Sequence, residues 1–106
     1  MSKYLLEVSY SAEGAKGILK DGGTKRRQVV EAAVTANGAR IEAFYFAFGT
    51  SDAVVIVDVP DRASLIAQNL AVNASGAATI KTTVLITPEE MDQASKKSPV
   101  YTPPGR

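Results

Sequence analysis

Two apolar stretches near the middle of the chain are separated by only four residues, and this spacing constrains the fold more than any other feature. Residues 40–48 and 53–59 each alternate in the way that strands do. The segment between them, Gly49-Thr50-Ser51-Asp52, consists of residues that favour turns. The two stretches are therefore predicted to pair as an antiparallel β-hairpin.

A further strand is predicted on each side of this hairpin, at 4–10 and 79–86, and helical segments separate the strands. In chain order these helical segments are 12–20, with Ser11 as its cap, 25–37 and 62–74. Gly22-Gly23 divides the first two, and Gly38 and Gly76 follow the second and third, as glycine commonly does at helix ends. The order is βαββαβ, which predicts an α+β, ferredoxin-like fold: an antiparallel sheet in the order 4-1-3-2 with helices on one face.

Strict alternation along each strand assigns side chains to the two faces of this sheet. The helix-covered face is predicted to hold Tyr4, Leu6, Val8, Tyr10, Ile41, Ala43, Tyr45, Ala47, Ala53, Val55, Val57, Val59, Ile80, Thr82, Val84 and Ile86. The inward stripes of the helices are predicted to be Val29, Val30, Ala33 and Val34, and Ala63, Ile66, Ala67, Leu70 and Ala74.

The opposite face is then predicted to carry Phe44, Phe46, Phe48 and Ile56, which we interpret as ligand-contacting residues. Aromatic side chains bury large areas, and a monomer rarely exposes a patch of that size. We expect a second copy of the chain to cover this face, as a homodimer or higher homo-oligomer.

The C-terminal segment offers an alternative cover. Thr87-Pro88-Glu89-Glu90 is a strong helix start, with Thr at the N-cap and Glu three residues later, and predicts a short polar helix over 88–97. Residues 98–106 are Pro-rich and predicted to be an extended tail, so residues 1–97 form the single domain. In this alternative the helix and tail fold back over the open face of their own sheet, and no second copy is needed to cover it.

Composition excludes several classes of function. The chain has no cysteine and no histidine, which removes thiolate and histidine chemistry and the usual ligands of zinc and haem. We expect no cofactor and no metal site. A net charge of +1 argues against nucleic-acid or polybasic membrane binding. With no signal-peptide pattern at the start, we expect a cytoplasmic location.

The candidate chemical groups lie on the predicted open face of the sheet. Glu7, Glu42 and Asp58 are candidate catalytic carboxylates because an apolar setting raises a carboxyl pKa, and Lys81 is their candidate charge partner. The alternative is that they form structural ion pairs. Thr24, Lys25 and Arg26, after Gly22-Gly23, form a weaker candidate anion site at a helix start, with a solvated helix end as its alternative.

The segments 16–27, 42–49, 55–61 and 81–90 together resemble the GYD domain family over nearly the whole chain, to about Glu90. The family's Gly-Tyr-Asp segment corresponds to the hairpin turn, where Gly49 and Asp52 remain and Ser51 replaces the tyrosine. The resemblance therefore favours a role in turn geometry for Gly49 and Asp52. It implies a ferredoxin-like fold similar to the dimeric α+β barrel proteins, and no established activity.

Two functions follow from these observations. The first is a homo-oligomeric domain that encloses a small, partly apolar ligand between paired sheets or serves as an assembly module. The second is a small cofactor-independent enzyme, of isomerase or oxygenase type, with a carboxylate base. The sequence leaves open whether the protein is an enzyme, which ligand it binds, and what role the tail has.

Overall fold

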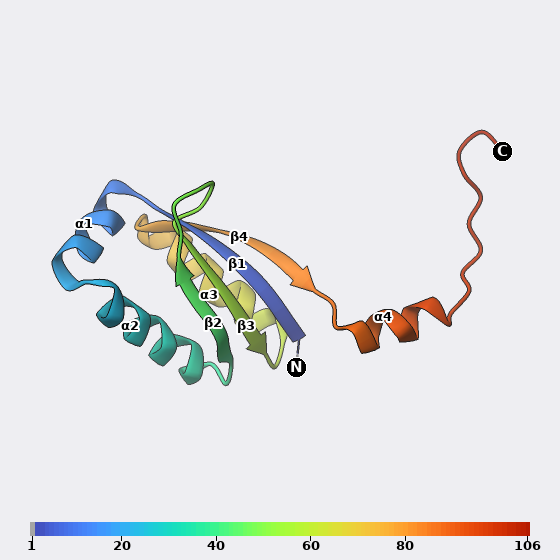
Figure 1. Ribbon diagram of the computed structural model, residues 1–106, viewed down its shortest axis with the longest axis horizontal. Helices are drawn as coiled ribbons and strands as arrows, with labels where there is room; N and C mark the ends of the chain where they lie inside the picture. The colour runs from blue at the N-terminus through green and yellow to red at the C-terminus, as the bar shows by residue number, and fades with distance from the viewer. Residues whose placement is uncertain (1) are drawn as a thin grey trace.

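The computed structural model describes residues 2–106 and contains four strands and four helices (Figure 1). In chain order they are β1 (Ser2–Tyr10), α1 (Ala12–Asp21), α2 (Gly23–Ala36), β2 (Arg40–Phe46), β3 (Ala53–Val59), α3 (Arg62–Ser75), β4 (Ala78–Leu85) and α4 (Pro88–Ser95). These bounds lie within about two residues of the predicted ones for every element.

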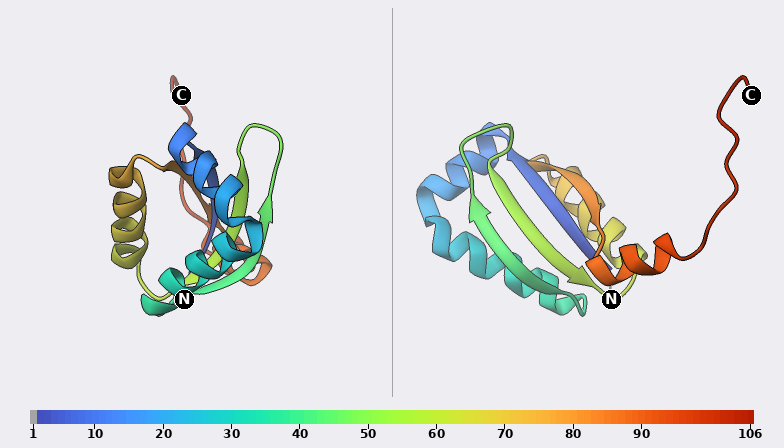
Figure 2. Two further views of the ribbon diagram at one scale, coloured as in Figure 1. Left: turned by 90° about the vertical axis from the view of Figure 1, so that its left-hand side faces the viewer. Right: turned by 45° about the vertical axis from the view of Figure 1, so that its right-hand side comes forward.

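The four strands form one antiparallel sheet in the order β2-β3-β1-β4. This is the predicted order 4-1-3-2 read from the other edge, and the α+β, ferredoxin-like prediction is confirmed. Helices α1, α2 and α3 lie on the same side of the sheet, with α2 beside β2 and α3 beside β4 (Figure 2). The two crossovers between strands therefore supply a single helical layer.

The helix boundaries follow from local hydrogen bonding. The Ser11 side chain accepts from the Gly14 amide at the start of α1, and Asp61 accepts from the Ser64 amide at the start of α3. Gly22 separates α1 from α2 with a φ of 82°, in the left-handed region that glycine adopts without strain. The predicted break between the first two helical segments is confirmed.

The core lies where β1 and β3 meet the helices. It is centred on Tyr4, Leu6, Val55, Val57, Val59 and Leu65. The strand residues in this set belong to the predicted helix-covered face, because Tyr4 pairs with Val57 and Leu6 pairs with Val55. For β1 and β3 the prediction from alternation is confirmed.

For β2 the predicted faces are wrong beyond Glu42, which lies on the open face as predicted. A β-bulge at Glu42 adds one residue, so that Ile41 pairs with Val57 but Ala43 pairs with Ile56. A shift of one residue moves every later side chain to the other face. Phe44 and Phe46 are therefore on the helix side, opposite Val55 and Ala53, whereas Ala43 and Tyr45 are on the open face. Phe48 lies beyond the end of β2 and is fully exposed.

The predicted inward stripe of α3 is also wrong. Ile66 and Leu70 are 50% and 63% exposed, and Ala63, Ala67 and Ala74 are exposed as well. The helix instead turns Leu65, which is buried, toward the sheet. Two hydrogen bonds accompany this rotation: Asn69 donates to the Thr82 hydroxyl over 3.0 Å, and Gln68 accepts from Asn37 over 2.8 Å.

Helix α4 and the tail project away from the sheet (Figure 1). Every residue from 88 to 102 is exposed, and no other described element packs closely against α4. The predicted capping box is present, with Thr87 and Glu90 each accepting from the other's backbone amide. The alternative in which this segment folds back over the open face of its own sheet is therefore wrong.

Candidate functional site

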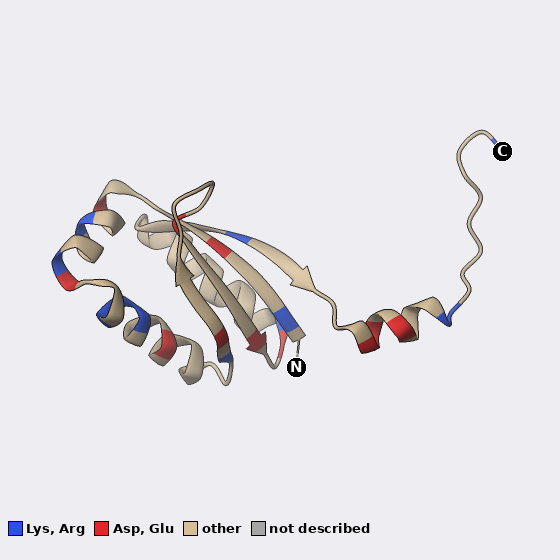
Figure 3. Ribbon diagram, in the orientation of Figure 1, with Lys and Arg blue, Asp and Glu red and all other residues tan. Residues whose placement is uncertain are grey.

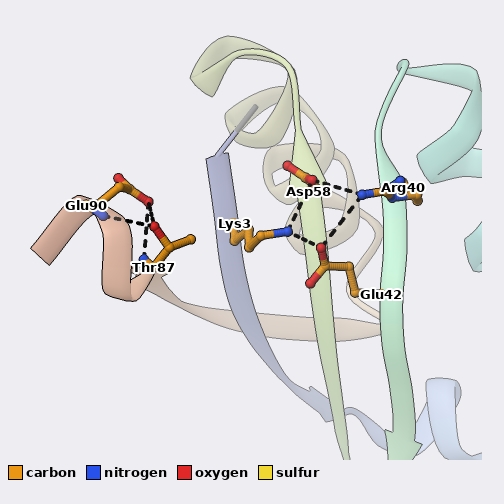
Figure 4. A network of polar contacts seen from close by, with 6 residues as sticks. All are labelled: Lys3, Arg40, Glu42, Asp58, Thr87 and Glu90. Atoms are coloured by element: carbon orange, nitrogen blue, oxygen red, sulfur yellow. Dashed lines mark hydrogen bonds and ion pairs between the residues drawn. The ribbon is translucent and has the colours of Figure 1, made fainter. Parts of the chain in front are cut away.

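Four charged side chains form a network at one end of the open sheet face (Figure 4). Asp58 is almost fully enclosed, and its Oδ2 lies 3.3 Å from the Lys3 ammonium and 3.2 Å from the Arg40 guanidinium. The Glu42 carboxylate contacts Lys3 directly and lies 3.8 Å from Arg40. Two cations thus face two carboxylates, each cation close to both.

This network explains the state of Lys3. Its hydrogen bond to Glu42, and after that its contacts with Asp58, raise the pKa of Lys3 above the usual value of 10.5. Lys3 and Arg40 were not among the predicted site residues. Two signals could have placed them on this face. Alternation along β1 applies to Lys3, and cross-strand pairing with Asp58 applies to both Lys3 and Arg40. For Glu42 and Asp58, the ion-pair interpretation describes what the structure contains.

Glu7 and Lys81 form a separate group at the other end of the same face. They lie directly opposite each other on β1 and β4, as predicted. Glu7 is four residues from Lys3 along β1, which is about 13 Å. A polar hollow of about 220 Å³ lies beside this pair, and the hairpin residue Ser51 also lines it. Figure 3 shows this division of charged residues between the two ends of the sheet.

A second hollow lies on the other side of the sheet, between the sheet, α2 and α3. This helix-side cavity has a volume of about 230 Å³. Its floor is the centre of the sheet, including Leu6, Val55 and Phe44, and its walls include Val30 from α2 and Val72 from α3. Phe44, predicted to contact a ligand on the open face, thus lines a cavity on the opposite face.

Two buried polar atoms in residues that line the helix-side cavity have no hydrogen-bond partner among the described residues. They are Nε of Arg26 and Oδ1 of Asn69. Arg26 belongs to the predicted anion site, but Thr24 and Lys25 are exposed and do not line this cavity. The structure therefore separates Arg26 from the two residues with which the sequence had grouped it.

Phe46 lies at the edge of this region and contacts the first turn of α2. A β-carbon at Gly23 would lie 2.8 Å from Cε2 of Phe46, closer than real β-carbons approach. The Phe46 ring also meets the Phe44 ring edge to face, with ring centres 5.3 Å apart. The absence of a side chain at Gly23 lets β2 and α2 come this close together.

The comparison with protein families gives one result that covers most of the chain. The GYD domain matches residues 4–95. The chain belongs to the GYD domain family. We found no match to this GYD domain among curated proteins or among solved structures.

In this GYD domain the hairpin loop is fixed by Asp52. Its Oδ2 accepts a hydrogen bond of 2.8 Å from the Tyr10 amide, and its own amide donates to the Val8 carbonyl over 2.8 Å. Both bonds tie the hairpin to the end of β1, which supports a role in turn geometry for Asp52. At Gly49 a β-carbon would meet nothing within 4 Å, so the geometry does not require glycine there.

Two further searches of residues 2–106 gave no candidates. No helix in this part of the chain has the length and apolar character needed to cross a membrane. No group of three or more of its acidic side chains is arranged to hold a metal ion.

Proposed function

We propose that this GYD domain works as a homo-oligomeric module whose copies pair through the open face of the sheet. The observation that supports this most directly is an apolar strip on that face that no other element within residues 2–106 covers. The open-face strip consists of Leu5, Ala43, Tyr45, Val54 and Ile56, which are cross-strand neighbours on β1, β2 and β3. Tyr45 is 69% exposed, and α4 projects away from the strip.

The dimensions of the chain support a missing partner. A compact chain of 11.2 kDa exposes about 5,700 Å², whereas this chain exposes 7582 Å². The radius of gyration is 17.0 Å, against about 13 Å for a compact domain of this length. The excess area, roughly 1,900 Å², includes α4 and the tail, in which every residue from 88 to 102 is exposed, so a partner that covered this segment would bury part of it.

The charged groups on either side of the open-face strip favour a copy of the same chain as the partner. The Lys3 network lies at one end of the strip and the Glu7–Lys81 pair at the other. In a two-fold pair the same patch meets itself, so each group meets its own copy or the other group. Both groups contain cations and carboxylates, so either arrangement offers opposite charges.

Helix α4 adds a second reason to expect a partner. An isolated helix of eight residues is marginal in water even when its ends are well capped. Its Met91 side chain, together with Val100 and Tyr101 of the tail, is more than half exposed. These apolar groups are available to pack on a neighbouring copy.

Pairing would also enclose the polar hollow beside Glu7 and Lys81, where a small ligand between the sheets would lie. We find no specific observation that favours catalysis by a carboxylate base. Glu42 and Asp58 are each held by two cations, and Glu7 faces Lys81. The assembly role is therefore the function that the geometry supports best.

The test replaces Ile56 by glutamate in the centre of the open-face strip. A buried, unpaired carboxylate costs several kcal/mol, so the dimer dissociation constant should rise at least about a hundredfold. Light scattering after gel filtration should give the wild type at least twice the chain mass of 11.2 kDa and Ile56→Glu the chain mass itself.

Ile66→Glu is the matched control, because it makes the same substitution at a residue of α3 that is already half exposed. It should keep the mass of the wild type. A monomeric wild type at about 100 µM, which would place the dissociation constant outside the range of stable interfaces, contradicts the proposal. So does an Ile56→Glu variant of unchanged mass.

A further inference from the structure

We propose that the helix-side cavity is a binding site for a small, mostly apolar organic acid. Its carboxylate would accept from Arg26 Nε, and its other end would donate a hydrogen bond to Asn69 Oδ1. The site is on the side of the sheet away from the proposed pairing surface, so it does not depend on that pairing.

The size and lining of the cavity set the size of the ligand. An engineered apolar cavity of about 150 Å³ is large enough to bind benzene. The helix-side cavity, at about 230 Å³, therefore has room for roughly ten non-hydrogen atoms, such as a ring with a short chain. Most of the lining is aliphatic, including Val8, Val30, Val57 and Ile80, with the Phe44 ring on the floor. An apolar ring is the part of a ligand that this surface would enclose.

The unpartnered polar atoms give the polar chemistry of the ligand. Buried donors and acceptors in native proteins nearly always have a partner, because an unmade bond costs free energy. Asn69 donates from its amide nitrogen to the Thr82 hydroxyl, and its Oδ1 is left as an acceptor without a partner. Arg26 Nε is a free donor. The ligand should thus present one acceptor and one donor.

Electrostatics identifies the acceptor as an anion. Arg26 is the only charged residue lining the cavity, and within residues 2–106 no carboxylate forms an ion pair with it. The first turn of α2, from which Arg26 projects, has no acidic residue and no side-chain cap, so its partial positive charge adds to that of Arg26. A charged group in a mostly apolar cavity favours a ligand that carries the opposite charge. A ligand with a single negative charge would neutralise the charge of Arg26.

The experiment uses the full chain labelled with ¹⁵N and titrated with a phenolic acid, 4-hydroxyphenylacetate. Its uncharged analogue 4-hydroxyphenylethanol is titrated in parallel, because the two differ only in the carboxylate. Changes in amide chemical shift should be confined to α2, α3 and the strand residues that line the cavity. The acid should bind at least about tenfold more tightly than the alcohol.

Two variants test the assignment. Arg26→Leu should weaken binding of the acid at least about tenfold and remove its advantage over the alcohol. Its matched control is Arg27→Leu, the same change at a half-exposed residue whose ion pair with Glu31 lies outside the cavity. Ala33→Phe, which fills the cavity from α2, should abolish binding of both compounds. Circular dichroism would establish that each variant is folded.

Chemical-shift changes at residues of the open face, in place of those around the cavity, would overturn the proposal. So would equal binding of acid and alcohol, or an Arg26→Leu variant that binds as the wild type does. An absence of shifts with 4-hydroxyphenylacetate, benzoate and hexanoate at millimolar concentration would also overturn it. Monomeric behaviour of the wild type in light scattering would contradict the proposed pairing and leave this site unaffected.

Discussion

Gly14 and Gly17 lie one turn apart in α1, and the same substitution at the two positions should change stability in opposite directions. Gly14 packs against the residue that precedes β4: a β-carbon there would overlap the carbonyl oxygen of Ala77 and lie 3.2 Å from Tyr10 Cδ1. That carbonyl is held in place, because it accepts from the Ser11 amide over 2.9 Å. At Gly17 a β-carbon would meet nothing within 4 Å.

The magnitudes follow from two opposing effects. Alanine in place of glycine inside a helix gains about 0.5–1 kcal/mol, and at Gly17 nothing opposes this gain. At Gly14 the helix must move away from a fixed backbone atom, and overpacking of this kind costs about 1–3 kcal/mol. We expect Gly17→Ala to raise the free energy of unfolding by up to about 1 kcal/mol and Gly14→Ala to lower it by about 1–2 kcal/mol.

Thermal unfolding followed by circular dichroism measures both variants. Each 1 kcal/mol shifts the midpoint by about 4–8 °C in a domain near this size, so Gly14→Ala should melt about 5–15 °C below the wild type. All samples should be at one protein concentration, because an oligomer has a concentration-dependent midpoint. If Gly14→Ala melts at or above Gly17→Ala, the close packing of α1 on Ala77 is refuted.

Two further predictions concern the charged network. Asp58→Asn should lower the free energy of unfolding by about 1–3 kcal/mol. Glu42→Gln should lower it by under about 1 kcal/mol, because the Glu42 carboxylate is more exposed than that of Asp58. Urea unfolding measures both variants. An equal or larger loss of unfolding free energy in Glu42→Gln contradicts the central position of Asp58 in the network. Because the folded-state pKa of Lys3 is raised above 10.5, its contribution is fully present below pH 10.5 and is lost as the pH rises through the folded value. Lys3→Arg should therefore retain more of its stability at pH 11 than the wild type, and identical alkaline unfolding profiles of the two would argue against this role.

Much of the candidate site could be read from the sequence, but its division into separate groups could not. The alternation along β1 placed Glu7 on the open face, and the strand order placed Lys81 beside it. Glu42 and Asp58 also reach that face. Alternation places Lys3 and Arg40 on it as well, but it does not show that these two cations pair with those carboxylates. Long side chains from three strands meet there, and their meeting depends on how those strands are paired.

The helix-side cavity could not be predicted from the sequence. A cavity of this kind depends on how far apart α2 and α3 lie, and side-chain type does not fix that distance. Arg26 was singled out for its position at a helix start. Asn69 stood out only as one of several polar residues toward the end of its helix that could present amide groups at a cavity rim, and helix-end polarity explains those residues equally well. Arg26 and Asn69 line the same cavity because α2 packs against β2 and because α3 turns a different side toward the sheet from the one predicted.

The sequence by itself determined the order of elements, the strand order and the ends of the helices. These depend on local chemistry: alternation, turn residues, Asp and Ser caps, and glycines where φ is positive. The family could also be identified from the sequence, and the match over residues 4–95 confirms it.

Only the tertiary structure decided which faces of β2 and α3 are inside. Both faces of β2 beyond Glu42 are apolar, so alternation reads equally well in either register. The bulge puts the two large rings of Phe44 and Phe46 under the helices, where Gly23 leaves room, and the smaller Ala43 outside. Helix α3 likewise has apolar residues all round. Hydrogen bonds to residues distant in sequence accompany the rotation that buries Leu65, and no local pattern contains those partners.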